Sequence, residues 1–261
     1  MQAHLDAIRA AFTRQADYIN TSPAFVNEER IRWLLHLAGQ PNGRGVRTEE
    51  QAALDVACGA GVMAEALARR VRHVTGVDIT PAVLERAEGR AKEAGLGNTK
   101  FVLGDAAHLP FPDASFDLVT CTSAFHHLDR PQQVMVEAAR VLRSGGAFCA
   151  MDITTPEVRP ARERHQEMER LRDPSHTFNL TPSAWRRLTQ GAGLTVMELG
   201  VATSHRDLEE WLTICPEEAK PQVRALFERD MGDGASGLQV RRNGEAVLFT
   251  HPMLLLRAEK G

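Results

Sequence analysis

The spacing of apolar residues along the chain changes after about residue 45. Before that point, apolar side chains recur every three or four positions, which predicts amphipathic helices in the first 40 residues. After it, short apolar runs alternate with helical patterns. The first of these runs is continuously apolar, which is typical of a strand buried on both faces of a parallel sheet. The alternation therefore predicts an α/β fold in which helices cover both faces of a mostly parallel sheet.

The predicted elements follow a regular order up to about residue 155. Strands are expected at residues 52–58, 73–79, 100–105, 116–124 and 147–153, with helices at 62–71, 81–94 and 131–142 between them. A helix at 182–191 and strands at 194–201 and 246–258 come later. Two partly helical stretches, 157–180 and 205–244, fall outside this alternation. Since ligands bind at the carboxyl edge of open α/β sheets, we expect these insertions to cover that edge.

The composition is that of a globular protein with a small net charge. Of 261 residues 43% are hydrophobic, and 31 basic against 34 acidic residues give a net charge of −3. Because no excess of positive charge is present, we expect no nucleic-acid partner. No apolar run approaches the roughly 20 residues of a membrane helix, and the charged first residues do not resemble a signal peptide. Together with four scattered cysteines that form no CxxC pair, these features predict a single-domain cytoplasmic protein.

Three acidic residues surround a turn that contains two glycines. Gly59 and Gly61 follow the first predicted strand and allow the backbone to turn sharply and approach a ligand. Asp55 lies within that strand, Asp78 ends the second strand and Asp105 ends the third. The turn alone also fits a relaxed dinucleotide-binding pattern, so a nicotinamide oxidoreductase is one interpretation. Such a site has no need of the first and third carboxylates, which disfavours it.

Each carboxylate has a physical role if the ligand is S-adenosylmethionine. Asp78 can accept hydrogen bonds from both ribose hydroxyls, Asp105 from the adenine amino group, and Asp55 can hold the ammonium end directly or through water. Charge-assisted bonds of this kind contribute about 1.5–3 kcal/mol each. The ligand carries no phosphate, and the glycine turn contains no lysine or arginine.

The motifs resemble those of class I S-adenosylmethionine-dependent methyltransferases, in the subgroup similar to ubiquinone- and menaquinone-biosynthesis enzymes. LDVACGAG is similar to the family's glycine motif, with Ala57 in place of the usual first glycine, and GVDI and GDAAHLPFPDASFDLV resemble the ribose and adenine motifs. TSAFHHLDRP and EAARVLRSGGAF match the next two signatures. The resemblance implies a Rossmann-like three-layer sandwich whose seven strands have the order 3-2-1-4-5-7-6.

The same resemblance divides the chain and assigns its cofactor residues. It implies a helical lid at residues 1–45, a cofactor-binding core at 46–155, and acceptor-cap insertions with the last strands at 156–261. The residues expected at S-adenosylmethionine, whose product is S-adenosylhomocysteine, are Tyr18, Asp55, Ala57, Gly59, Gly61, Asp78, Ile79, Asp105, Ala106 and Ser123. Ser123 would lie under the sulfonium. Tyr18 of the lid would reach the sulfur or the carboxylate, although ordinary helix packing is an equal alternative.

Methyl transfer depends mainly on bringing the acceptor into line with the S–CH₃ bond. A general base is needed only if the acceptor carries a proton, and His127 is the candidate for that role, with packing against the cofactor as the alternative. His126, Arg172 and His176 are weaker candidates for acceptor contact. No metal site is expected, because adjacent histidines are too close in sequence and no Cys/His spacing matches a zinc site.

The predicted function is methyl transfer to an O, N or C atom of a small organic molecule. An alternative is a protein that binds the same cofactor but catalyses a cyclisation or decarboxylation. Large side chains in the later part of the chain suggest a partly apolar acceptor pocket; they are His165, Met168, Trp185, His205, Trp211, Phe227 and Met231.

Overall fold

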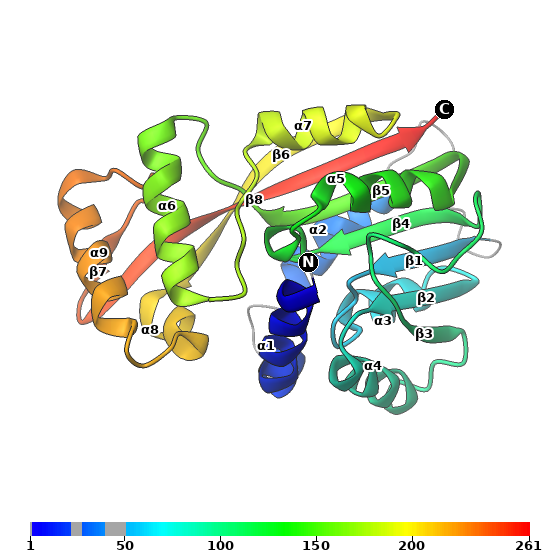
Figure 1. Cartoon of the computed structure of the whole chain (residues 1–261), viewed down its shortest axis with the longest axis horizontal. Helices are drawn as coiled ribbons and strands as arrows, with labels where there is room; N and C mark the ends of the chain where they lie inside the picture. Colours follow the sequence, from blue (N-terminus) through cyan, green and yellow to red (C-terminus); the bar gives the residue numbers. More distant parts are fainter. Residues whose placement is uncertain (1, 22–27, 40–50) are drawn as a thin grey trace.

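A computed structural model describes residues 2–21, 28–39 and 51–261 of the chain. Its strands form one sheet of the order β3-β2-β1-β4-β5-β8-β6, and β7 pairs with β8 (Figure 1). The first five strands are mutually parallel, whereas β8 is antiparallel to both of its long neighbours, β5 and β6. The predicted fold class and strand order are thus confirmed, with one short strand added.

The strands lie close to the predicted ranges, with three differences. Their bounds are β1 Ala52–Val56, β2 His73–Asp78, β3 Thr99–Leu103, β4 Phe116–Thr122, β5 Leu142–Ile153, β6 Leu194–Asp207, β7 Arg241–Asn243 and β8 Ala246–Lys260. Strand β5 begins directly after the preceding helix because Leu142 pairs with Phe116 across a register shift, where a loop was expected. Strands β6 and β8 are longer than predicted because they continue to pair beyond the body of the sheet.

Helices cover both faces of the sheet and make it a three-layer structure. Their bounds are α1 Gln2–Thr21, α2 Glu28–Gly39, α3 Val62–Ala68, α4 Pro81–Glu93, α5 Pro131–Val141 and α7 Pro182–Gly191. Successive residues of the central strands enter different cores: Leu54 packs with α5 and α7, whereas Ala53 packs with α2 and α3. Burial on both faces explains why these strands read as continuous apolar runs.

The two insertions form a cap beside the body of the sheet, around the extended parts of β6 and β8 (Figure 1). The cap contains α6 Arg159–Arg172, α8 Leu208–Trp211, the short 3₁₀ helix η2 Leu212–Ile214 and α9 Lys220–Asp233. Met168, Trp211 and Phe227 are buried together in a separate hydrophobic core of the cap. The expectation that these side chains line an acceptor pocket is therefore wrong, and Trp185 likewise belongs to the core of the main sheet.

Helix α1 lies beside α4 near the carboxyl ends of the first strands (Figure 1). The Arg9 Nε atom donates a hydrogen bond of 3.2 Å to the backbone oxygen of Ile79, just after β2. The lid predicted at residues 1–45 stays a prediction, and residues 1, 22–27 and 40–45 of it lie outside the described part of the chain. None of the described helices is both long enough and apolar enough to span a membrane.

Candidate active site

A pocket opens where the carboxyl ends of β1, β2 and β4 meet α1. Most of the predicted cofactor residues line it, namely Ala57, Gly59, Asp78, Ile79, Asp105, Ala106 and Ser123. These residues come from four different loops of the chain, and the parallel strands bring the loops to one edge. These predicted residues therefore gather at one pocket, and their contact with the cofactor stays a prediction.

The glycine turn is held by the aspartate that ends β2. The backbone amide of Gly59 donates to Oδ2 of Asp78 at 3.0 Å, and the amide of Thr80 donates to Oδ1 at 2.9 Å. Burial raises the pKa of the Asp78 carboxyl, against the lowering effect of these two bonds. Asp78 thus shapes the turn as well as facing the pocket.

Two residues of the turn, Gly61 and Ala57, have left-handed backbone angles. The first angle allows close packing, and the second strains the backbone. Gly61 has φ 76°, and a Cβ atom there would lie 2.9 Å from the Cβ of Ala87 on α4. It therefore permits the close approach of the turn to α4 without lining the pocket. Ala57 has φ 51°, a conformation that costs about 1–2 kcal/mol for a residue other than glycine. The departure from the family's glycine motif thus falls at a strained position.

Asp55 lies behind the turn and is fully buried. Its Oδ1 atom accepts a 2.8 Å hydrogen bond from the Thr120 hydroxyl, whereas Oδ2 has no hydrogen-bond partner. Burial raises the pKa of Asp55 to about 7, although the Thr120 bond and the nearby Ala64 amide act in the opposite direction. Asp55 does not itself line the pocket, but a buried carboxylate oxygen without a partner is costly, so it calls for a cation, a water molecule or a proton.

Asp105 is more exposed and already has several partners. Its Oδ1 atom accepts from the Ala107 amide at 2.9 Å, and Oδ2 accepts from Arg130 at 2.9 Å. Burial raises the pKa of the Asp105 carboxyl, but these bonds, the contact with His108 and the Arg130 charge outweigh it and lower the pKa. Asp105 is therefore ionised and fixed at the rim of the pocket.

The adjacent histidines of the short 3₁₀ helix η1, Phe125–His127, have different surroundings. His126 faces the protein body, where its Nδ1 lies 2.5 Å from Oδ1 of Asp152. Burial lowers the pKa of His126, but the charge and hydrogen bond of Asp152 outweigh it and raise the pKa. His127 lines the pocket. The two rings thus face different sides, and the roles predicted for His126 and His127 toward an acceptor stay predictions.

His127 is held from behind by the polar segment that follows α6. Its Nδ1 lies 3.2 Å from the backbone oxygen of Ser175 and 3.1 Å from the Ser175 hydroxyl. That hydroxyl donates to Oδ1 of Asp173 at 2.6 Å, so both Ser175 oxygens are acceptors toward the imidazole. Nδ1 therefore carries the ring hydrogen, and the lone pair lies on Nε2.

The His127 ring is neutral at ordinary pH. Burial lowers the pKa of His127 to about 4, assisted by the charge of His126 and opposed by that of Asp173. The ring also makes an edge contact with Phe12 of α1, with 4.9 Å between centroids. A buried, neutral and oriented imidazole at the pocket is suited to accept a hydrogen bond or a proton.

Besides Asp55, Gly61 and His126, three further predicted residues do not line this pocket. The Tyr18 hydroxyl donates instead to Oε1 of Glu210 in the cap at 3.2 Å. Arg172 is buried against the Trp211 ring and donates to the Trp211 backbone oxygen at 3.0 Å. His176 is buried beside Gln166, with 3.3 Å between Nε2 and Oε1. Arg172 and His176 thus lie in buried polar contacts and do not line this pocket, so their contact with an acceptor stays a prediction. Ser175 of the same segment contacts the pocket residue His127.

Several further pocket residues were missed in the sequence, among them residues of the first two helices. Leu5, Ile8 and Phe12 line the pocket from α1, and Arg30 lines it from α2. The spacing of the first three residues was the available signal, since i, i+3 and i+7 share one helix face. Burial lowers the pKa of Arg30 to about 10, so it remains charged beside Ser123, to whose hydroxyl it donates at 3.5 Å.

The described residues fit S-adenosylmethionine on physical grounds. The unpartnered Asp55 oxygen suits an ammonium group, and Asp78 and Asp105 offer acceptors at the pocket for hydroxyl and amino groups. Apolar side chains of α1 close one side, as required for an adenine or thioether contact.

Comparisons with known proteins agree with this chemistry. The family model described as "Methyltransferase domain" matches residues 54–150. The chain is 34% identical over 250 residues to the uncharacterized methyltransferase YcgJ of Bacillus subtilis, covering 92% of this chain and 99% of YcgJ. The crystal structure of YcgJ has a TM-score of 0.82 to this chain at 27% identity, covering 90% of this chain and 99% of YcgJ.

Two further proteins are similar to this chain. The crystal structure of BH2331 from Bacillus halodurans has a TM-score of 0.81 to this chain at 27% identity, and the match covers 89% of this chain and 99% of BH2331. The demethylmenaquinone methyltransferase of Listeria welshimeri is 36% identical over 108 residues, 40% of this chain and 46% of that enzyme. The chain therefore belongs to the class I S-adenosylmethionine-dependent methyltransferases, and S-adenosylmethionine is its cofactor.

Proposed function

We propose that the enzyme methylates an O, N or C atom of a small organic molecule in the cytoplasm. The observation that carries the proposal is the position of a neutral, oriented His127 in a pocket closed by α1. A pocket covered by a helix favours a small acceptor over a macromolecule, and the net charge of −3 does not favour nucleic acid.

Different residues of the site would bind different parts of the cofactor. When bound, S-adenosylmethionine supplies an electrophilic methyl group on a positively charged sulfur. Asp78 would hold the ribose, Asp105 and the Ala106 backbone the adenine edge, and Asp55 the ammonium end. Ser123 and the backbone of Ala57 and Gly59 would line the methionine part.

Arg30 adds a charge that the family motifs did not predict. It lies in the pocket next to Ser123, so its guanidinium would attract a carboxylate of the cofactor or an anionic group of the acceptor. Leu5, Ile8 and Phe12 would exclude water from the same space. Water exclusion strengthens every polar contact in the pocket, because it lowers the effective dielectric constant.

His127 would orient the acceptor through the lone pair on Nε2. This position would bring the acceptor atom into line with the methyl group that the bound cofactor supplies. An acceptor proton, where there is one, would pass to Nε2. A pKa of about 4 makes His127 a weak base, so its main contribution is positioning, with proton removal important only for acidic acceptors.

The proposal is tested by assaying a panel of small O, N and C acceptors for S-adenosylhomocysteine release. Transfer should require both cofactor and acceptor, and His127→Ala should lower kcat while calorimetry shows nearly unchanged S-adenosylhomocysteine binding. His205→Asn, which removes an exposed histidine of β6, is the matched control. Conversion of an acceptor without S-adenosylhomocysteine release would instead support the cyclisation or decarboxylation alternative.

A further inference from the structure

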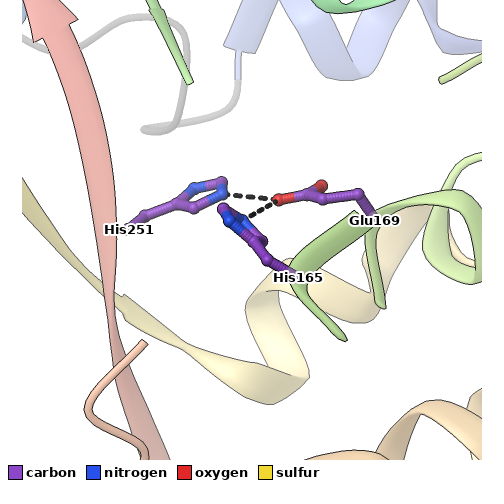
Figure 2. Close-up of side chains that lie close together, drawn as sticks. All are labelled: His165, Glu169 and His251. Atoms are coloured by element: carbon purple, nitrogen blue, oxygen red, sulfur yellow. Dashed lines mark hydrogen bonds and ion pairs between the residues drawn. The ribbon is translucent and has the colours of Figure 1, made fainter. Parts of the chain in front are cut away.

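Three buried polar side chains of the cap meet outside the methyl-transfer pocket. His165 and Glu169 project from α6, and His251 projects toward them from β8 (Figure 2). The Nε2 atoms of His165 and His251 lie 3.2 Å and 2.6 Å from the same carboxylate oxygen, Oε1 of Glu169. One ligand atom from each residue lies within 4.8 Å of the other two. Among the residues that the structure describes, this is the one such group.

The charge of this cluster needs a positive partner. Glu169 is 1% exposed, and within the described part of the chain no lysine or arginine nitrogen lies within ion-pair distance of it. Its close partners are the two imidazoles, which can balance the charge only with a shared proton or with a bound cation. Two imidazole nitrogens and one carboxylate form a donor set that zinc-like ions prefer and that magnesium and calcium do not.

The hydrogen bonds of the cluster are also incomplete. Both rings approach the same Glu169 oxygen, and the Nδ1 atom of His165 is buried without a hydrogen-bond partner. Because Nδ1 lies on the other edge of the His165 ring, it calls for a water there, whereas the two Nε2 atoms that share one carboxylate oxygen mark the side on which an ion can bind. We propose that His165, Glu169 and His251 bind a single divalent transition-metal ion of the zinc type.

The backbone supports this arrangement from two elements. His165 and Glu169 are four residues apart, so they share one face of α6. His251 belongs to the long strand β8, where it pairs opposite Ser204 of β6. Ligands around zinc at 2.0–2.1 Å are separated by about 3.3 Å, so a small outward movement of His251 would suffice.

A bound ion would fix α6 to the sheet, independently of methyl transfer. The segment that supports His127 begins where α6 ends, and the Asp173 amide donates to the Glu169 backbone oxygen at 2.9 Å. The ion would therefore have a structural role, because it would link α6 of the cap to strand β8. No sequence motif indicates this cluster, because His251 lies 82 residues after Glu169.

The test uses the full chain without a histidine tag, stripped of metal with a chelator. Zn²⁺ is titrated by calorimetry, and Co²⁺ is used as a probe whose visible absorption reports nitrogen and oxygen coordination. We expect one ion per chain. The unfolding midpoint should rise by about 5–10 °C at a free Zn²⁺ concentration one hundred times the dissociation constant.

Variants then assign the ion to this cluster. Glu169→Gln and His251→Asn should each weaken Zn²⁺ binding more than about 100-fold, because even indirect partners of metal ligands contribute about 10- to 100-fold. His205→Asn, an exposed histidine on the same strand pair, should leave binding unchanged.

Two results would overturn the site. The first is the lack of saturable one-to-one binding by the wild-type protein, which does not depend on the folding of any variant. It would mean that a proton balances the Glu169 charge. The second is a Co²⁺ absorption spectrum that is unchanged in both single variants, His165→Gln and Glu169→Gln. That result would place the ion elsewhere.

Discussion

The protonation of His127 can be tested without knowledge of the acceptor. Burial, the nearby charge of His126 and limited compensation by Asp173 lower the pKa of His127 to about 4. In the unfolded chain the pKa of a histidine is about 6.5. As the pH falls from 8 to 5, the unfolded state therefore takes up a proton that the folded state does not. The contribution of His127 to stability is present above pH 6.5 and is lost as the pH falls toward 4.

The size of this effect follows from the two pKa values. At pH 5 the unfolded histidine is almost fully protonated and the folded one is about one-tenth protonated, which costs about 2 kcal/mol of unfolding free energy. Below pH 4 the cost approaches about 3 kcal/mol. In His127→Asn this titration is removed. The drop in unfolding free energy between pH 8 and pH 5 should then be smaller by about 2 kcal/mol than in the wild type.

Urea unfolding at the two pH values measures this difference, with His205→Asn as the control for loss of an exposed histidine. Long-range ¹H–¹⁵N spectra give a second, direct reading, because they report both the titration midpoint and the tautomer. We expect a midpoint near pH 4 and the hydrogen on Nδ1, as the two Ser175 acceptors require. A midpoint near 6.5, or a hydrogen on Nε2, would refute the reasoning.

Four other features of the pocket give testable outcomes. Asp78→Asn should weaken S-adenosylhomocysteine binding about 10- to 150-fold in calorimetry, since it removes a charged acceptor worth about 1.5–3 kcal/mol; unchanged affinity would contradict the ribose role. Because burial raises the pKa of Asp55 to about 7, binding of the cofactor's ammonium should favour the ionised form and strengthen as pH rises from 6 to 8. Calorimetry in buffers of different ionisation enthalpy should show proton release, and a pH-independent affinity would count against this contact. Ala57→Gly should raise the unfolding free energy by up to about 1 kcal/mol, because relief of the left-handed strain exceeds the added freedom of the unfolded chain. Amides of α1 should exchange more slowly with S-adenosylhomocysteine than without it, and equal exchange would show that α1 is not a lid.

The sequence predicted the sheet well because its signals are local. Continuous apolar runs, a glycine turn and a proline at the start of α4 and α5 each act within a few residues. The parallel order of strands then brings Asp78 and Asp105 to one edge without further information. The register shift before β5 was missed because it depends on how Leu142 meets Phe116, a pairing that no local pattern contains.

The cap was predicted less well because its interior resembles a pocket in sequence. Trp211 and Phe227 are spaced irregularly among polar residues, and the same composition suits either a ligand-binding surface or a small core. Only the arrangement of α6, α8 and α9 around Phe249 shows that they fill a core of their own. Likewise, the polar segment after α6 suggested direct acceptor contact, whereas Ser175 acts on the pocket through His127.

The three predicted carboxylates show the limit of motif reasoning most clearly. In sequence, Asp55, Asp78 and Asp105 are alike, each at or near the end of a strand. Burial and partners separate them: the pKa of Asp55 is raised to about 7 by burial, whereas hydrogen bonds and the charge of Arg130 lower the pKa of Asp105. One of them can therefore exchange a proton when a cation arrives, and another stays ionised throughout. Because these differences come from residues distant in the chain, a motif can name the ligands of the cofactor but not the charge that each one carries.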